Sequence, residues 1–226
     1  MTQAGNATYR GPDVLPPVVP LFPLPGALLL PRGQLPLNIF EPRYLAMVED
    51  AMRGDRLIGM IQPRFDRGAV DLDGRPPLVE TGGLGRITQY AETGDGRIVL
   101  TLTGVSRFRI VEEMSTTTPY RIARITAAPF ASDFTPGFGQ EAVDRKAVMT
   151  AFKAFLEAND LEADWNSFNG ADNEPIVNSL AMMSPYGAAE KQALLEAADL
   201  KTRGDILVAI TERMLAGRAS PHGPLQ

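Results

Sequence analysis

The sequence contains no cysteine and a single histidine, His222, which lies four residues before the C-terminus. The absence of cysteine excludes a disulfide framework, a thiol nucleophile and a cysteine-ligated metal site. His222 belongs to a Ser-Pro-His-Gly-Pro stretch that we expect to be disordered, which argues against histidine acid–base catalysis and a histidine-ligated zinc site. We therefore predict no catalytic residue, no metal site and no cofactor.

Lysine is also scarce, and its placement excludes one class of enzyme. None of the four lysines follows a glycine, so the chain has no G-x-x-x-x-G-K-[ST] phosphate loop and is not a P-loop ATPase. It has no recognisable nucleophile-elbow motif either, which argues against a hydrolase.

The long apolar run Val14–Pro31 looks at first like a membrane segment, because it has 18 uncharged residues. Six prolines in that run argue against a membrane helix, since each interior proline costs roughly 3 kcal/mol. The preceding residues include Arg10 and Asp13, carry no net charge and lead to no signal-peptide cleavage pattern. We expect a cytoplasmic protein without a membrane partner.

The 226-residue chain divides into two compositional regimes. Residues 1–13 and 217–226 are polar and aperiodic, which predicts disordered tails. Between them, we predict a β-barrel domain over residues 14–130 and a helical bundle over residues 131–216. Charge divides at the same point: residues 1–130 carry 14 basic and 13 acidic side chains, whereas residues 131–226 carry 8 and 14.

The first regime predicts many short strands, because turn residues separate short apolar stretches. The strands are expected at Leu57–Gln62, Leu78–Glu92, Arg97–Val111 and Tyr120–Ala127. Gly94-Asp95-Gly96 suits a hairpin turn between the second and third of them, and Gly104 predicts a bulge or sharp bend. One helix is expected to begin at Pro42 and to stop at Gly54. The prolines of the apolar run restrict it to extended or edge-strand backbone.

The second regime has helical periodicity. Helices are expected at Gln140–Ala158, Glu174–Met183, Ala188–Ala197 and Arg203–Ala216. Thr202, with Asp205 three residues later, resembles a capping box at the start of the last helix.

Three polar motifs invite a chemical interpretation, and each has a simpler structural one. Gly82–Gly85 resembles a phosphate loop, but more strand follows it instead of a helix, which favours a bulge or a close strand approach. The acidic pairs Glu112-Glu113 and Asp71-Leu72-Asp73-Gly74 invite acid–base or calcium chemistry. Solvated turns account better for both pairs.

Arginine and the aromatic residues leave alternatives open. All 14 basic residues before Pro129 are arginine, and five on predicted strands offer phosphate contacts or ordinary salt bridges. These five are Arg86, Arg107, Arg109, Arg121 and Arg124. The lack of a positive excess favours salt bridges and makes nucleic acid an unlikely partner. Phe22, Phe40, Tyr44 and Phe65 suit either a core or an apolar peptide groove.

Several ordered segments carry a family resemblance over about Val14 to Leu215. The segments are Val18–Leu24, Ala27–Pro31, Leu35–Tyr44, Gly83–Ile87, Arg97–Leu100, Thr103–Ile110, Pro119-Tyr120, Val177–Leu180 and Glu190–Glu196. In order and spacing they resemble the N-terminal, or substrate-binding, domain of Lon protease. The resemblance implies an α+β fold, with a PUA-like β pseudo-barrel followed by an α-helical bundle. The sequence lacks the ATPase and Ser-Lys protease domains of Lon, so we expect a stand-alone form that is not an enzyme.

In Lon, the resembled domain helps to recognise unfolded or tagged substrates and contributes to assembly. The resemblance therefore implies a module that binds unfolded or extended polypeptide, or a protease or chaperone partner, as an adaptor or regulator of proteolysis. An RNA-binding PUA-like domain is the alternative. For peptide binding we expect an apolar patch near Phe22, Phe40 and Tyr44, rimmed by Arg32 and Arg43.

Overall fold

The computed structural model describes residues 1–64, 75–161, 168 and 170–219, and its α+β class confirms the predicted fold class. The strands are β1 (Thr2–Ala4), β2 (Ala7–Tyr9), β3 (Val18–Pro23), β4 (Gln34–Ile39), β5 (Leu57–Ile61), β6 (Thr81–Glu92), β7 (Ile98–Met114) and β8 (Arg121–Thr126). The α-helices are α1 (Pro42–Arg53), α2 (Arg145–Glu157), α4 (Asn173–Met183), α5 (Ala188–Glu196) and α6 (Leu200–Ala219). Short 3-10 turns occur at Pro12–Val14, Ala128–Phe134 and Gln140–Ala142.

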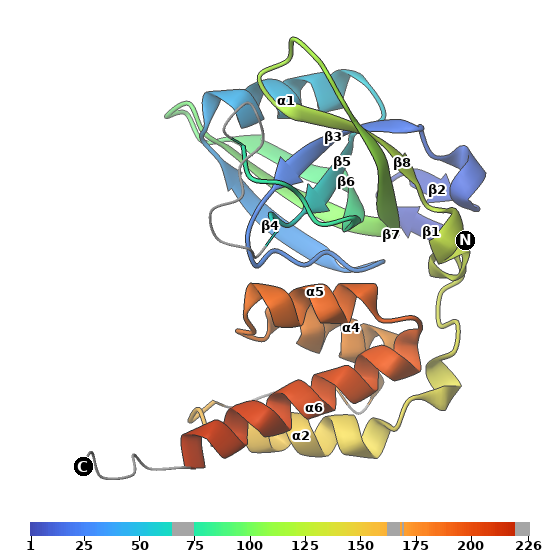
Figure 1. Cartoon of the computed structure of the whole chain (residues 1–226), viewed down its shortest axis with the longest axis vertical. Coiled ribbons are helices and arrows are strands. Elements are labelled where there is room, and N and C mark those ends of the chain that lie inside the picture. The colour runs from blue at the N-terminus through green and yellow to red at the C-terminus, as the bar shows by residue number, and fades with distance from the viewer. Residues whose placement is uncertain (65–74, 162–167, 169, 220–226) are drawn as a thin grey trace.

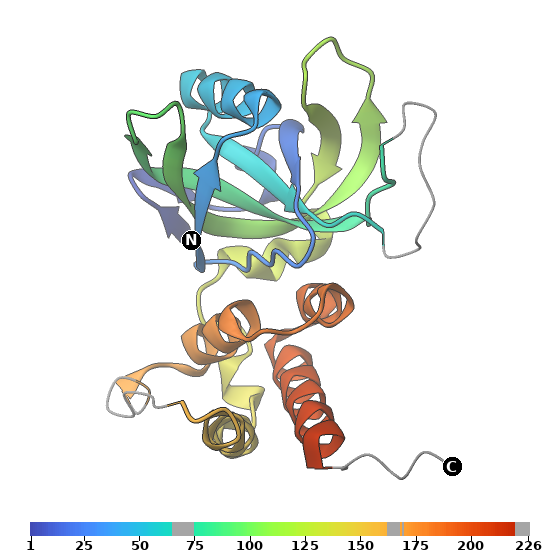
Figure 2. The same cartoon turned by 90° about the vertical axis from the view of Figure 1, so that its left-hand side faces the viewer.

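The strands form a barrel and the later helices form a bundle beside it (Figures 1 and 2). Helix α1 covers the end of the barrel that faces away from the bundle, whereas α4 and α5 lie next to the barrel. The six-stranded sheet has the order β4-β7-β6-β5-β3-β8, and pairing between β7 and β8 closes it. Strand β7 is long enough to pair with β4 along its first half and with β8 along its second half.

The local predictions for the barrel are confirmed at several elements. Helix α1 begins at Pro42, whose missing N–H costs nothing in the first turn, and it ends before Gly54. Strands β6 and β7 form the predicted hairpin, with Gly94 and Gly96 at positive φ. The register shift at Leu84/Gly85 leaves an extra residue, Val105, on β7, which is the bulge expected at Gly104.

Strand β3 tolerates two prolines because each lies where the strand is paired with another strand on one side only. Pro20 pairs with Ile122 of β8, before the pairing with β5 begins at Leu21. Pro23 pairs with Ile61 of β5, beyond the end of the pairing with β8. The predicted extended or edge-strand backbone is therefore confirmed: Val18–Pro23 is an extended strand, and it lies between β5 and β8 in the sheet.

The segment between β3 and β4 links the two halves of the fold. Leu29 belongs to the apolar core of the barrel, whereas Leu28 and Leu30 belong to the core of the helical bundle. This segment crosses so close to the barrel that a Cβ on Gly83 would overlap with the carbonyl oxygen of Leu29. In the same way, a Cβ on Gly104 would overlap with the carbonyl oxygen of Leu30. Glycine is therefore needed at both positions for close backbone approach, as predicted for the Gly82–Gly85 stretch.

Two helices begin at residues other than those predicted. Helix α2 begins at Arg145, because the Asp144 carboxylate caps it by accepting a hydrogen bond from Ala147 N at 2.9 Å. Helix α6 begins at Leu200, upstream of the capping box expected at Thr202. The Asp199 carboxylate accepts a hydrogen bond from Thr202 N at 2.7 Å, so Thr202 receives the cap that we expected it to provide.

The prediction of disordered tails is wrong at the N-terminus and, at the C-terminus, for residues 217–219. Strands β1 and β2 form an antiparallel hairpin in which Thr2, Ala4 and Tyr9 are buried. Ala4 and Tyr9 pack into a second apolar cluster of the barrel, and the Thr2 hydroxyl donates a hydrogen bond to Asp133 O at 3.1 Å. Tertiary burial thus orders a segment that is too short to show periodicity. Helix α6 extends to Ala219, and residues 220–226 lie outside the described chain.

Candidate functional site

The structure buries two of the aromatic residues predicted to form a binding patch. Phe22 and Tyr44 belong to the barrel core, and their ring centroids lie 4.2 Å apart. The alternative interpretation of these aromatics as core residues is therefore correct for this pair. Phe40 is different, because 63% of its surface is exposed where β4 ends and α1 begins.

Arg43, the second residue of α1, lies beside the buried pair. Its guanidinium carbon is 4.5 Å from the centroid of the Tyr44 ring, and its side chain forms a 2.7 Å ion pair with Glu41. Arg43 and Glu41 are both about half exposed, so the ion pair is weak and leaves the guanidinium accessible to a ligand.

Arg32 does not rim this surface, contrary to the prediction. Its guanidinium donates hydrogen bonds to Thr2 Oγ1 at 2.9 Å and to Asp133 O at 2.6 Å, and it forms an ion pair with Glu174 of α4. Arg32 therefore joins the barrel to the bundle. Its φ of +64° belongs to the left-handed region, which a sequence pattern does not reveal for arginine.

The residues Arg43 and Tyr44 line a hollow of about 260 Å³, which we call the proline pocket. Its walls come from segments that are far apart in the sequence: Pro23, Pro25, Arg43, Tyr44, Pro63, Arg75, Pro76, Pro119, Tyr120 and Arg121. Five prolines and two tyrosines give it an apolar body, and three arginines give it positive charge. No carboxylate of the described residues lines it, so its chemistry suits an apolar group that carries a negative charge.

Side-chain contacts behind the walls hold the proline pocket in shape. Arg121 makes a two-point contact with the Glu113 carboxylate, at 2.8 and 2.6 Å, and donates to Pro76 O at 2.6 Å. The Tyr120 hydroxyl donates to Asp50 Oδ2 at 2.7 Å. Burial, reinforced by this hydrogen bond, raises the pKa of Tyr120 to about 12, and burial also raises the pKa of Tyr44. Both phenols are therefore neutral at physiological pH and act as apolar surface with a fixed orientation.

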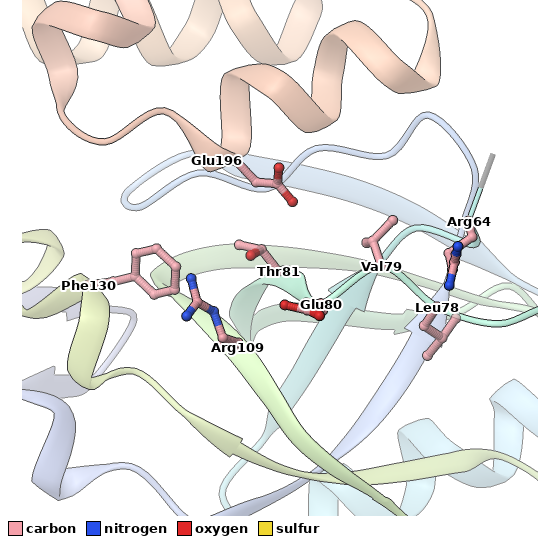
Figure 3. Close-up of a pocket in the computed structure, with 8 residues that line it drawn as sticks. All are labelled: Arg64, Leu78, Val79, Glu80, Thr81, Arg109, Phe130 and Glu196. Carbon is pink, nitrogen blue, oxygen red and sulfur yellow. The ribbon is translucent and has the colours of Figure 1, made fainter. Parts of the chain in front are cut away.

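A larger hollow is the cleft of about 860 Å³ between the barrel and α5 (Figure 3). It is lined by Arg64, Leu78, Val79, Glu80, Thr81, Arg109, Phe130 and Glu196. Arg109 and Glu80 extend from the barrel side, and Glu196 extends from the end of α5 above them. Two arginines and two glutamates balance, so the cleft lacks the single sign of charge that distinguishes the proline pocket.

Four of the five strand arginines make contacts within the protein. The Arg107 guanidinium is buried against Asp133, and Arg121 is held by Glu113. Arg86 donates to Asp55 O at 2.6 Å, and Arg124 lies 3.9 Å from the Glu112 carboxylate. These contacts favour the salt-bridge interpretation over the RNA alternative, which needs a continuous row of accessible arginines.

Some residues singled out in the sequence fall outside the described chain, namely Phe65, Asp71–Gly74 and His222. Within residues 1–64, 75–161, 168 and 170–219, no group of three or more acidic or histidine side chains is arranged to hold a metal ion. No helix in that part of the chain has the length and apolar character needed to cross a membrane.

Sequence reasoning missed Tyr120 and the pocket prolines as site residues. Pro119-Tyr120 carries part of the family resemblance, but no local pattern indicates that it meets α1. The pocket exists only because the loop before β8 folds over α1 and the end of β3.

Comparison with known proteins identifies the family to which the chain is similar. A family model described as the ATP-dependent protease La (LON) substrate-binding domain matches residues 18–213. Lon protease 2 of Myxococcus xanthus is 27% identical over 201 residues, which cover 88% of this chain and 24% of that protein. Lon protease of Anaeromyxobacter dehalogenans is 26% identical over 215 residues, which cover 92% of this chain and 25% of that protein. The chain thus spans about a quarter of the length of these relatives.

Two solved structures share the fold. The N-terminal domain of the Mycobacterium avium complex Lon protease aligns with a TM-score of 0.64 at 18% identity, over 86% of this chain and 98% of that one. The Lon N-terminal domain protein from Xanthomonas campestris aligns with a TM-score of 0.57 at 23% identity, over 85% of this chain and 97% of that one.

Proposed function

The chain belongs to the Lon substrate-binding domain family, and from this premise we propose that it binds unfolded or extended polypeptide segments. We further propose that it acts in this way as an adaptor or regulator of proteolysis, without catalytic activity of its own. The matching family model describes a substrate-binding domain, which supports the first part of this proposal.

The proline pocket is the observation that carries the proposal. Its proline and tyrosine walls would bury an apolar side chain, which contributes about 25 cal/mol per Å² of apolar surface removed from water. Its arginines would attract a carboxylate, either on an acidic side chain or at a chain terminus. Phe40 does not line the pocket, but it is exposed and lies three residues before Arg43, where it adds apolar surface. A folded protein hides most of its apolar side chains, so this combination favours unfolded segments.

Binding of reduced, carboxymethylated α-lactalbumin, a permanently unfolded chain, tests the proposal by fluorescence anisotropy. Arg43→Glu should weaken binding about tenfold, because it places a negative charge beside the pocket. Phe40→Ser should weaken binding several-fold without lowering stability, since Phe40 is 63% exposed.

Both variants have matched controls in the chain. Arg97 is 54% exposed and is paired with Asp95 two residues earlier, just as Arg43 is 52% exposed and paired with Glu41. Phe138 is 60% exposed, close to the value for Phe40, but lies outside the barrel strands. Arg97→Glu and Phe138→Ser should leave binding within twofold of wild type. No saturable binding by the wild-type protein, or equal losses in variants and controls, would refute the proposal.

A further inference from the structure

The proline pocket is one end of a longer depression. A second hollow of about 240 Å³, the middle hollow, shares Tyr120 with the proline pocket. A third of about 510 Å³, the hairpin hollow, shares Pro16, Gly54, Asp55 and Leu57 with the middle hollow. Because neighbouring hollows share wall residues, we treat the three together as one groove, which runs from the N-terminal hairpin past Tyr120 to the N-terminal end of α1.

The floor of this groove is the proline-rich run itself. Val14 and Leu15 line the hairpin hollow, Val18–Pro20 line the middle hollow, and Pro23 and Pro25 line the proline pocket. An extended chain rises about 3.3 Å per residue, so the twelve residues from Val14 to Pro25 span at most about 40 Å. A ligand lying along them would need on the order of ten extended residues.

The groove favours side-chain contacts over strand addition. Strand β3 is paired with β8 along Val18–Leu21 and with β5 along Leu21–Pro23, and Pro20 and Pro23 have no N–H to donate to an added strand. Val18 is 38% exposed on this floor. Apolar burial without backbone pairing tolerates many sequences, as recognition of unfolded segments requires.

Charge gives the groove a direction. Three arginines and no carboxylate of the described residues line the proline pocket; Arg121 is held by Glu113 behind the wall, and the half-exposed Arg43, in its weak ion pair with Glu41, is the guanidinium accessible to a ligand. The middle hollow instead carries two carboxylates, Asp50 and Asp55, against one guanidinium, Arg56. A negative group on the ligand is therefore attracted to the proline pocket and disfavoured farther along the groove.

We infer that the whole groove, from the hairpin hollow to the proline pocket, binds one extended apolar segment of about ten residues. The carboxylate-bearing end of that segment lies in the proline pocket. This inference rests on the proposed function, because it assigns the substrate class and binding direction of the same site. Tyr120 forms the ridge between two hollows, and its hydrogen bond to Asp50 holds it in place.

Two labelled synthetic peptides test the inference by fluorescence anisotropy. The long peptide has about ten apolar residues and a free terminal carboxylate, and the short peptide is its last third or so. Val18→Asp should weaken binding of the long peptide at least fivefold and leave binding of the short peptide unchanged, because the short peptide reaches only the proline pocket. Moving the negative charge to the middle of the long peptide, with both termini blocked, should also weaken binding, because the charge then faces Asp50 and Asp55 in either orientation.

Val99→Asp is the matched control, since Val99 is a strand valine of similar exposure, 43%, that lines none of the three hollows. Val14→Asp, at a 53% exposed position in the hairpin hollow, replaces Val18→Asp if circular dichroism shows that the latter is unfolded. If Val18→Asp and Val14→Asp bind the long peptide as wild type does while Arg43→Glu does not, the extended groove is refuted and the proposed function survives. Failure of both peptides to bind wild type refutes both.

Discussion

Arg107 of β7 and Asp133 form a two-point ion pair that is buried where the barrel meets the helices. Arg107 Nε and Nη2 lie 2.9 and 2.8 Å from the two Asp133 carboxylate oxygens, and Arg107 N donates to the same carboxylate at 2.9 Å. The remaining guanidinium nitrogen donates to Leu195 O and Ala197 O at the end of α5. The Arg107 side chain thus pairs with the Asp133 carboxylate and donates hydrogen bonds to carbonyl groups at the end of α5. It thereby joins the barrel to the helical bundle.

Removing one partner of this pair should cost a large part of what removing both costs. Asp133→Ala leaves the Arg107 charge buried without its counter-ion, and we expect a loss of about 3–5 kcal/mol in the free energy of unfolding. Arg107→Met combined with Asp133→Ala should lose less than the sum of the two single variants. Urea denaturation of the wild type and three variants measures this coupling. Additive losses would show that the two side chains act independently.

Gly104→Ala should displace the segment that carries Leu28 and Leu30. The new methyl group would overlap with the Leu30 carbonyl oxygen, and backbone cannot move aside as a flexible side chain can. We expect a loss near the upper end of overpacking effects, about 3 kcal/mol, in urea denaturation.

Gly11→Ala is the control for this substitution, because no atom lies within 4 Å of a Cβ there and the Gly11 φ of 179° suits any residue. Its stability should stay within about 0.5 kcal/mol of wild type. A Gly104→Ala protein as stable as Gly11→Ala would contradict the close approach.

Arg32 should affect stability and leave peptide binding unchanged. Arg32→Ala and Arg32→Gly both lose the hydrogen bonds to Thr2 and Asp133 and the ion pair with Glu174. Only glycine relieves the left-handed backbone, so Arg32→Gly should be about 1 kcal/mol more stable than Arg32→Ala in thermal or urea denaturation. Anisotropy with the unfolded chain should give wild-type affinity for both. If a fully folded Arg32→Ala protein bound the unfolded chain more weakly than wild type, Arg32 would belong to the binding surface after all.

Tyr120 should make stability fall at alkaline pH. Its pKa is raised from 10.0 in the unfolded chain to about 12 in the folded protein, so between these values the unfolded state releases a proton that the folded state retains. Its contribution to stability is therefore complete below pH 10 and is lost as the pH rises toward 12.

The variant Tyr120→Phe keeps the ring and removes the ionisable group. We expect a smaller loss of stability between pH 10 and 12 than in wild type, measured by urea denaturation at each pH. Phenolate absorbance should also lose its transition of highest pKa. Loss of a transition near pH 10 instead would show that Tyr120 ionises as an ordinary exposed tyrosine does.

Elements with a strong local pattern could be predicted from the sequence, and those ordered by distant contacts could not. Pro42 and Gly54 mark both ends of α1, because proline and glycine act on the backbone directly. The hairpin β1–β2 has strands of three residues each, too few to show a period of two. Only the burial of Thr2 and Tyr9 against the barrel orders it.

The candidate site could be predicted only where its residues belong to an element with a strong local pattern. Arg43 and Tyr44 lie in the first turn of a predictable helix and do line the proline pocket. Arg32 looks equally exposed in the sequence, but its left-handed backbone and its contacts with Asp133 and Glu174 depend on how two domains meet. Tyr120 reaches Asp50 across 70 residues of sequence, a contact that no local pattern reveals.

The placement of Leu28 and Leu30 in the helical core constrains how the protein folds during synthesis. A ribosome releases these two leucines long before the helices that cover them, so the nascent barrel displays them to solvent and to any chaperone nearby. The bundle, for its part, has an incomplete core until it receives them. A barrel without the helices would therefore expose two leucines, and a bundle without this segment would lack part of its core.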